Sequence, residues 1–131
     1  MKKTGIIFIV VAFFIMVFTG CGKMMNKIEE TRVMEIKDVD LASVADGTYK
    51  GSHPVGPMKY VVDVTVSDHK IASIDIVEAF SGNEYSRKGQ AILDSVIANK
   101  SLEIDVITGA TVTSKAYLAA IEDALRKGLK D

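Results

Sequence analysis

The chain has 131 residues, enough for one compact domain, and its charges nearly cancel, with 16 Lys and Arg against 17 Asp and Glu. This balance argues against a nucleic-acid-binding role, which normally shows clustered basic surface. The single cysteine excludes a disulfide within the chain, so the fold must be stabilised by packing.

The first segment has the layout of a secretory signal. Lys2 and Lys3 form a basic start, and an unbroken apolar run follows from Gly5 to Phe18. This run is shorter than the roughly 18 to 20 residues of a spanning helix, which favours a cleaved signal over the alternative of a permanent membrane anchor. We therefore expect residues 1–20 to be a signal peptide of the lipoprotein type.

The residues around Cys21 are similar to the lipobox of bacterial lipoproteins, in which the cysteine is lipidated and becomes the first mature residue. Phe18 departs from that pattern, because leucine is commoner at its position. Lipidation of Cys21 would anchor the protein in the cell membrane on the extracytoplasmic face, at the cell surface or in the periplasm. The alternative is an incidental or buried thiol. Without Lys2 and Lys3 the chain has 14 basic and 17 acidic residues, a formal charge of −3.

Residues 21–45 are charged and short of aromatic side chains, and their apolar residues show no sustained period. We interpret this segment as a lipid-anchored spacer, with at most one or two helical turns, that lifts the domain off the bilayer. The alternative is that it packs on the domain as an extra element. Residues 46–131 are then expected to form the domain itself.

The first part of the domain predicts strands. A turn signal at Asp46 and Gly47 precedes a short strand over Thr48–Ser52, and both prolines fall between His53 and Met58, which predicts a loop. The clearest strand runs over Tyr60–Ser67, where apolar and polar residues alternate. Its apolar face consists of Tyr60, Val62, Val64 and Val66.

A hairpin follows from the next alternation, in which Ala72, Ile74 and Ile76 share a face. His69 falls in the tight connection, where glycine is often found, and histidine is enriched at positive φ. We therefore expect His69 to be a turn residue. A metal site built on His53 and His69 would need more ligands than two isolated histidines offer.

The second part predicts helices. A polar loop over Ser81–Arg87 leads to a helix over Gln90–Ala98, which ends at Asn99–Ser101. A short strand is expected over Leu102–Ile107. The last helix, over Thr113–Lys127, is the best defined, since helical spacing puts these residues on one face: Tyr117, Ala120, Ile121, Ala124 and Leu125.

The opposite face of the last helix carries two favourable i, i+4 charge pairs, Glu122 with Arg126 and Asp123 with Lys127, and Gly128 is a plausible stop. The element order β-β-β-α-β-α predicts an α+β fold class, a small antiparallel sheet with helices packed on one face.

The turn from Thr108 to Ser114 contains glycine and leads into the last helix. Thr111, Thr113 and Ser114 can all cap exposed N–H groups there. Free amides and the helix dipole favour a phosphate, but the dipole contributes only roughly 0.3 to 1 kcal/mol at an exposed site. On these residues alone, a helix cap that binds nothing is the better explanation.

Three segments in order change that balance: DGTYKGS from Asp46, KIASIDIVEA from Lys70 and DVITGATVTSKA from Asp105. Together they closely resemble the FMN-binding domain family, which includes the covalently flavinylated subunits of sodium-pumping NADH:quinone reductases and of Rnf complexes. The resemblance covers about Asp46 to Leu129. Its most specific part is the motif Asp105-x-x-Thr108-Gly109-Ala110-Thr111, the TGAT motif. The resemblance implies that a dedicated flavin transferase, with FAD as the donor, attaches FMN to the last threonine or serine of this motif.

The resemblance makes Thr111 the acceptor. Gly109 and Ala110 would keep the approach narrow enough for a modifying enzyme. A covalent bond also compensates for weak phosphate binding, because a tethered flavin meets its pocket at high effective concentration.

Other cofactor-binding roles follow from the same resemblance. Thr108, Thr113 and Ser114 would contact the phosphate or the ribityl chain, or would only cap the helix. Asp105 would orient the acceptor loop or help to hold the transferase's metal, or it is an ordinary turn carboxylate.

Tyrosines are the candidates to pack on the flavin ring, although each also suits a core or loop position. The loop around His53 departs from the glycine-rich version common in the family, which puts flavin contacts from that side in doubt. The candidates are Tyr49, Tyr60 and Tyr85.

The function implied is electron transfer by FMN between a membrane dehydrogenase or a quinone-linked redox partner and an acceptor, rather than stand-alone catalysis. The sequence shows no paired catalytic carboxylates, no nucleophile with a base and no metal cluster. Two alternatives remain open: a surface lipoprotein that binds a ligand or partner without flavin, and a regulatory or assembly subunit of a larger flavoprotein reductase.

Overall fold

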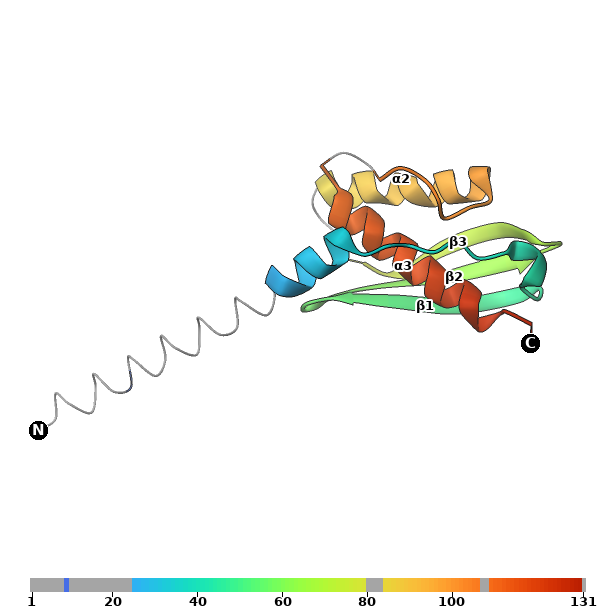
Figure 1. The fold of residues 1–131 in the computed structure, drawn as a ribbon, viewed down its shortest axis with the longest axis horizontal. Helices are drawn as coiled ribbons and strands as arrows, with labels where there is room; N and C mark the ends of the chain where they lie inside the picture. The colour runs from blue at the N-terminus through green and yellow to red at the C-terminus, as the bar shows by residue number, and fades with distance from the viewer. Residues whose placement is uncertain (1–8, 10–24, 80–83, 107–108, 131) are drawn as a thin grey trace, which may run out of the picture.

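The computed structural model describes residue 9 and residues 25–79, 84–106 and 109–130. A three-stranded antiparallel sheet in the order β1-β2-β3 packs against two long helices (Figure 1). This arrangement confirms the predicted small α+β fold. The elements in chain order are η1 (Leu41–Ser43), β1 (Gly47–Val55), β2 (Met58–Ser67), β3 (Lys70–Glu78), α2 (Glu84–Asn99) and α3 (Thr111–Lys127).

The β2–β3 hairpin is confirmed. Asp68 and His69 form its turn with φ angles of 53° and 58°, the left-handed backbone that two-residue hairpin turns require. The predicted apolar face of β2 is buried, and its four residues belong to the core: Tyr60, Val62, Val64 and Val66.

The predicted alternation in β3 is wrong at its start. Thr65 pairs with Ser73 while Val66 pairs with Ile71, so Ala72 is the extra residue of a β-bulge. The bulge turns Ile71 into the core, where it is 5% exposed, and leaves Ala72 on the surface. A period-2 pattern cannot register one inserted residue.

Strand β1 is longer than predicted, since it includes His53 and Pro54, which the sequence placed in a loop. Proline is tolerated because β1 is an edge strand, where a missing N–H breaks no central ladder. The connection to β2 shrinks to Gly56 and Pro57, with Gly56 at φ 59°.

Helix α3 approaches β1 closely at Gly51. A Cβ atom on Gly51 would lie 1.8 Å from the Ala120 carbonyl oxygen and 2.6 Å from the Ala124 nitrogen. Only a hydrogen fits there, and the two facing residues of α3 are themselves small. The helix therefore packs backbone against backbone on the strand, and the predicted apolar face of α3 is fully buried as expected.

The free edge of β1 is covered by polar side chains of α3. Asp123 accepts a hydrogen bond from the Ser52 N–H at 3.0 Å, and the Lys127 ammonium donates to the Lys50 carbonyl. An edge strand with free N–H and C=O groups can pair with a strand of another chain, and these two contacts occupy one such N–H and one such C=O group of β1.

The charge pairs and the stop of α3 are as predicted. Arg126 pairs with Glu122 at 2.7 Å and Lys127 with Asp123 at 3.4 Å. Gly128 caps the helix with ordinary right-handed geometry, φ −93°. Its glycine is required by packing, because a Cβ atom would lie 2.5 Å from the Tyr49 ring.

Two predictions between the helices are corrected. Helix α2 begins at Glu84, inside the predicted polar loop Ser81–Arg87. No strand forms over the described residues 102–106 of the predicted strand Leu102–Ile107. The Leu102 N–H instead donates to the Asp38 carboxylate at 3.0 Å, so this segment pairs with a side chain and not with a sheet edge.

Residues 25–45 pack on the domain, which is the alternative to the free spacer. They form a helix through residues 25–33 and then follow α3 from its start to its end (Figure 1). Lys115 donates to the Met34 carbonyl at 3.0 Å, and Val44 forms a β-bridge with Leu129. We call residues 25–45 the N-terminal strap.

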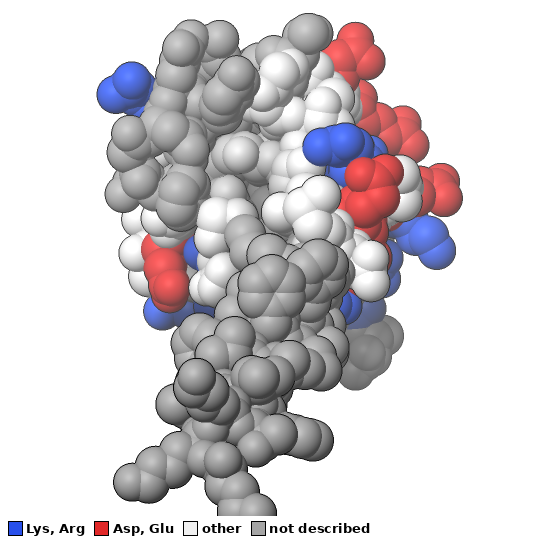
Figure 2. Space-filling view, turned by 90° about the vertical axis from the view of Figure 1, so that its left-hand side faces the viewer, with Lys and Arg blue, Asp and Glu red and all other residues white. Residues whose placement is uncertain are grey.

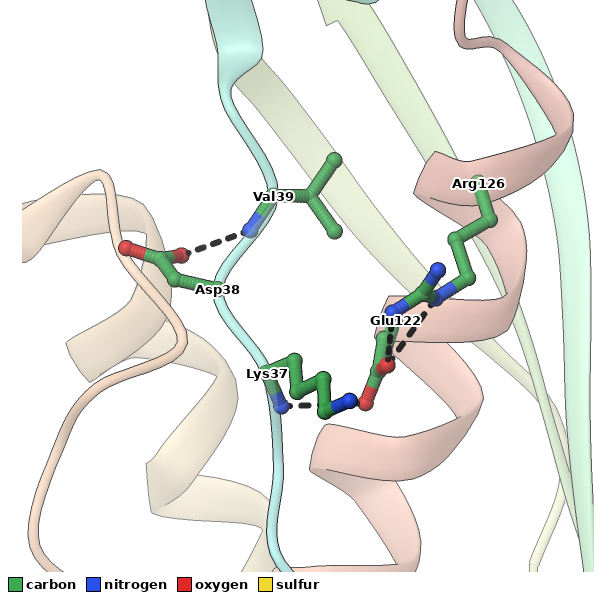
Figure 3. A network of polar contacts seen from close by, with 5 residues as sticks. All are labelled: Lys37, Asp38, Val39, Glu122 and Arg126. Atoms are coloured by element: carbon green, nitrogen blue, oxygen red, sulfur yellow. Dashed lines mark hydrogen bonds and ion pairs between the residues drawn. The ribbon is translucent and has the colours of Figure 1, made fainter.

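Asp38 ties the middle of the strap to the segment after α2. Figure 3 shows it turned away from α3, while the neighbouring Lys37 N–H faces Glu122. The Asp38 carboxylate accepts from the Val39 N–H at 3.0 Å, from the Leu102 N–H at 3.0 Å and from the Ser101 hydroxyl at 2.7 Å. Partial burial raises the pKa of Asp38, but these hydrogen bonds outweigh it and hold the pKa below its usual value.

Cys21 and nearly all of the predicted signal peptide lie outside the described residues, so lipidation stays a prediction. Among the helices that the structure describes, none is long and apolar enough to cross a bilayer.

Replacing Asp38 with alanine is expected to lower the free energy of unfolding at pH 7 by about 1 to 2 kcal/mol, because three donors lose a charged acceptor. Asp94→Ala on the exposed face of α2 is the control. Its side chain makes no hydrogen bond in the described part of the chain, so urea unfolding should shift by less than about 0.5 kcal/mol.

The effect of Asp38→Ala should depend on pH. Because the folded-state pKa of Asp38 is depressed, the ionised carboxylate stabilises the fold above the unfolded-state pKa of about 3.9. That contribution is lost as the pH falls through the folded-state pKa, so the wild-type and variant unfolding curves should converge in acid. A constant difference down to the acid limit would contradict this account.

Candidate functional site

Helix α3 begins at Thr111, two residues earlier than the pattern indicated, and the described part of the predicted turn leads into it. Gly109 has φ 82°, a left-handed value that suits glycine. Ala110 is the N-cap and offers no side-chain hydrogen bond, and Thr111 is the first residue of the helix. The first N–H groups of a helix have no intrahelical acceptor, so this start can bind an anion.

A pocket of about 410 Å³ opens at this helix start. Thr111 and Thr113 both line it, and both residues are partly exposed. The pocket is lined by Arg32, Gly109, Ala110, Thr111, Val112 and Thr113.

Ser114 does not line this pocket. It is completely buried, and its hydroxyl donates to the Ala110 carbonyl at 2.7 Å, alongside the Ser114 N–H at 2.9 Å. These two hydrogen bonds stabilise the turn from the buried side of the helix. The sequence grouped Ser114 with the cofactor-binding residues because spacing alone cannot tell which side of a first turn faces the core.

Asp105 is also apart from Thr111. Its exposed side chain lines a different pocket, of about 560 Å³, with Ser101, Glu103 and the end of α2. Thr108 lies outside the described residues. The structure therefore joins Gly109, Ala110 and the two threonines of the motif, and it leaves the motif's carboxylate in another pocket.

Helix α2 supports the site from behind through Gly89. A Cβ atom on Gly89 would lie 2.3 Å from the Thr113 methyl carbon and 3.0 Å from its Cβ. Thr113 thus contributes to the pocket and to the contact between α2 and α3. Its methyl group determines how closely the two helices approach.

Arg32 was not among the predicted site residues, because the segment that contains it was interpreted as a spacer. It is a basic residue in a charged segment, and nothing in its neighbours indicates a site. It makes a 3.5 Å contact with Glu29, and both side chains are more than half exposed. On the face shown in Figure 2, basic and acidic side chains of the described residues are interspersed.

A third pocket, of about 340 Å³, lies on the other side of the strap helix, where Thr31 and Met34 face His53 and Pro54. The Thr31 hydroxyl lies 3.2 Å from His53 Nε2. Burial lowers the pKa of His53, partly offset by the Glu30 carboxylate. Among the described residues, no three side chains of His, Cys, Asp or Glu are grouped so that they could hold a metal ion.

The two described tyrosine candidates are committed elsewhere. Tyr60 is buried, with its ring edge-on to Tyr117 at a centroid distance of 5.1 Å. The Tyr49 hydroxyl donates to the Ala45 carbonyl at 2.7 Å. Neither lines the pocket at Thr111. For Tyr85 the structure describes the backbone in α2 and not the side chain.

Tyr117 carries the one described buried side-chain polar atom without a hydrogen-bond partner, its hydroxyl oxygen. Burial raises the pKa of Tyr117, and the Gln90 side chain nearby acts in the opposite direction. Gln90 follows Gly89, so this hydroxyl lies near the contact between α2 and α3 rather than in the pocket.

Comparison with known proteins bears on this site. The family model described as "FMN-binding domain" matches residues 55–126, more than half of the chain. An uncharacterized protein of Treponema pallidum (strain Nichols) is 25% identical over 100 residues, 76% of this chain and 28% of that protein. A urocanate reductase of Eggerthella lenta is 34% identical over 65 residues, 49% of this chain and 11% of that protein. The matches thus span small parts of much longer relatives.

The contact between Gly89 and Thr113 predicts a measurable coupling. Gly89→Ala should lower the free energy of unfolding by about 1 to 3 kcal/mol, because the new methyl overlaps the Thr113 side chain. Thr113→Ser removes the clashing methyl and should recover part of the loss in the double variant. Additive single and double effects in urea unfolding would show that the overlap is relieved elsewhere.

Proposed function

Because the chain belongs to the FMN-binding domain family, with FMN as its cofactor, we propose that it is an electron-transfer lipoprotein whose FMN is bound covalently to Thr111. One observation supports this assignment most directly. Thr111 is the first residue of a long helix and lines an open pocket that the basic residue Arg32 also lines.

The residues of the pocket suit the phosphate end of FMN. A phosphate needs N–H donors and positive charge, and the pocket offers the first amides of α3, the helix dipole and Arg32. Thr111 and Thr113 add two hydroxyl groups. The volume of about 410 Å³ lies within the range of small-molecule sites.

Attachment requires a flavin transferase and FAD as the donor. The Thr111 hydroxyl oxygen forms a bond to the phosphorus on the flavin side of FAD. The bond from that phosphorus to the bridging oxygen breaks, AMP leaves with the bridging oxygen, and the hydroxyl proton is released. No electrons are exchanged in this step, so it needs no oxidant.

Once bound, FMN supplies reversible electron transfer, and the protein supplies position and polarity. The pocket is open, which suits exchange with successive partners rather than catalysis on an enclosed substrate. We propose a membrane dehydrogenase or a quinone-linked protein as the redox partner. The match to part of a urocanate reductase supports the link to reductive chemistry.

Cys21 would place this carrier on the membrane. The basic start, the apolar run and the small residues before Cys21 support lipidation after export. The strap begins at residue 25, four residues beyond Cys21, so such a domain would lie close to the membrane surface and not at the end of a long tether.

Thr111→Ala should abolish flavin attachment. The full chain would be co-expressed with a flavin transferase, denatured, and examined for flavin fluorescence and for the FMN mass increment on the protein. Thr111→Ser is the matched control, since it keeps a hydroxyl group at the same position and should keep the increment. A colourless wild type would instead favour a surface lipoprotein that binds without redox activity.

Cys21→Ser should abolish acylation of the protein without affecting the fold. Wild-type protein is expected to enter the detergent phase and to give an acylated amino-terminal peptide by mass spectrometry. The variant should keep its uncleaved amino-terminal segment and lack the acyl mass. An unmodified Cys21 in the exported wild type would disprove lipidation.

A further inference from the structure

Arg32 reaches the pocket from outside the segment that matches the family. The family model begins at residue 55, whereas Arg32 lies in the strap helix through residues 25–33. Of the described residues that line the pocket, Arg32 alone carries a charge. The pocket therefore combines the start of α3, within the matched segment, with a cation from the strap, before that segment.

The backbone on both sides of Arg32 is fixed. Thr31 is 3% exposed, and its hydroxyl donates to the Lys27 carbonyl at 2.9 Å while contacting His53. On the other side, the Met34 carbonyl accepts from Lys115 at 3.0 Å. These contacts join the strap helix to β1 and to α3, so Arg32 is held beside the start of α3 and does not reach it by chance.

The Arg32 guanidinium has unused capacity. It offers five N–H donors, and among the described residues its one ion-pair partner is a Glu29 oxygen at 3.5 Å, in an exposed pair. Exposed pairs of this kind contribute little, so exchanging Glu29 for a second anion costs little. A phosphate group is a better partner than this single contact, because two of its oxygens can accept two parallel N–H bonds from the planar guanidinium.

We propose that Arg32 is a cofactor-binding residue that holds the phosphate group of FMN, an inference that rests on the proposed function. Before attachment it would bind the phosphate of the incoming flavin. After attachment it would pair with the single negative charge of the phosphoester on Thr111. The strap is then part of the cofactor site.

The test compares FMN with riboflavin, which lacks the phosphate, on the unloaded full-length chain. Binding would be followed by flavin fluorescence in wild type, Arg32→Gln and Arg32→Lys. Arg126→Gln is the matched control, since Arg126 also pairs with a glutamate on its own helix but lies at the far end of α3. Thermal unfolding of each variant checks the fold.

Wild type should bind FMN more tightly than riboflavin, and this preference should weaken as salt is added. Arg32→Gln should weaken FMN binding about threefold to tenfold and leave riboflavin binding unchanged. Arg32→Lys should be intermediate, and Arg126→Gln should match wild type. Equal binding of FMN and riboflavin by wild type, or unchanged FMN binding by Arg32→Gln, would overturn the proposal.

A parallel incubation with flavin transferase and FAD separates this inference from the proposed function. A wild type that gains no flavin mass but shows an Arg32-dependent preference for FMN would refute covalent attachment and support Arg32. If the wild type is flavinylated and Arg32→Gln binds FMN as well as the wild type does, covalent attachment is supported and the role of Arg32 is refuted.

Discussion

The close approach of β1 and α3 at Gly51 is the constraint on which the rest of the structure depends. With no side chain between strand and helix, the axis of α3 is fixed relative to the sheet. Asp123 can then reach the edge of β1, and Tyr117 meets Tyr60 in the core. The start of α3, and with it Thr111, is positioned by the same contact. A rigid helix is a suitable base for a binding site.

The strap extends this arrangement along the whole length of α3. Its contacts advance in step, with Met34 at Lys115, Lys37 at Glu122 and Val44 at Leu129. The strap forms a covering layer on α3 and lies before the segment that the family model matches. Arg32 enters the pocket as a result of that layer.

Patterns with a strong local cause were predictable. The alternation of β2 and the apolar face of α3 follow from periodicity, and the match of the TGAT motif to the family led to FMN. The bulge at Ala72 and the strand position of Pro54 depend on pairing with distant residues, which a local pattern does not record. The place of Arg32 in the pocket could not be predicted for the same reason, since it depends on how the strap packs on α3.

The hydrogen bond between Thr31 and His53 has a consequence for the histidine itself. A threonine hydroxyl has one hydrogen, and Thr31 directs it to the Lys27 carbonyl, so its oxygen must accept from His53. The neutral ring is therefore the tautomer with hydrogen on Nε2, and a second proton would add to Nδ1. Protonation leaves the bond to Thr31 in place, so this joint between strap and sheet does not depend on the ring being neutral.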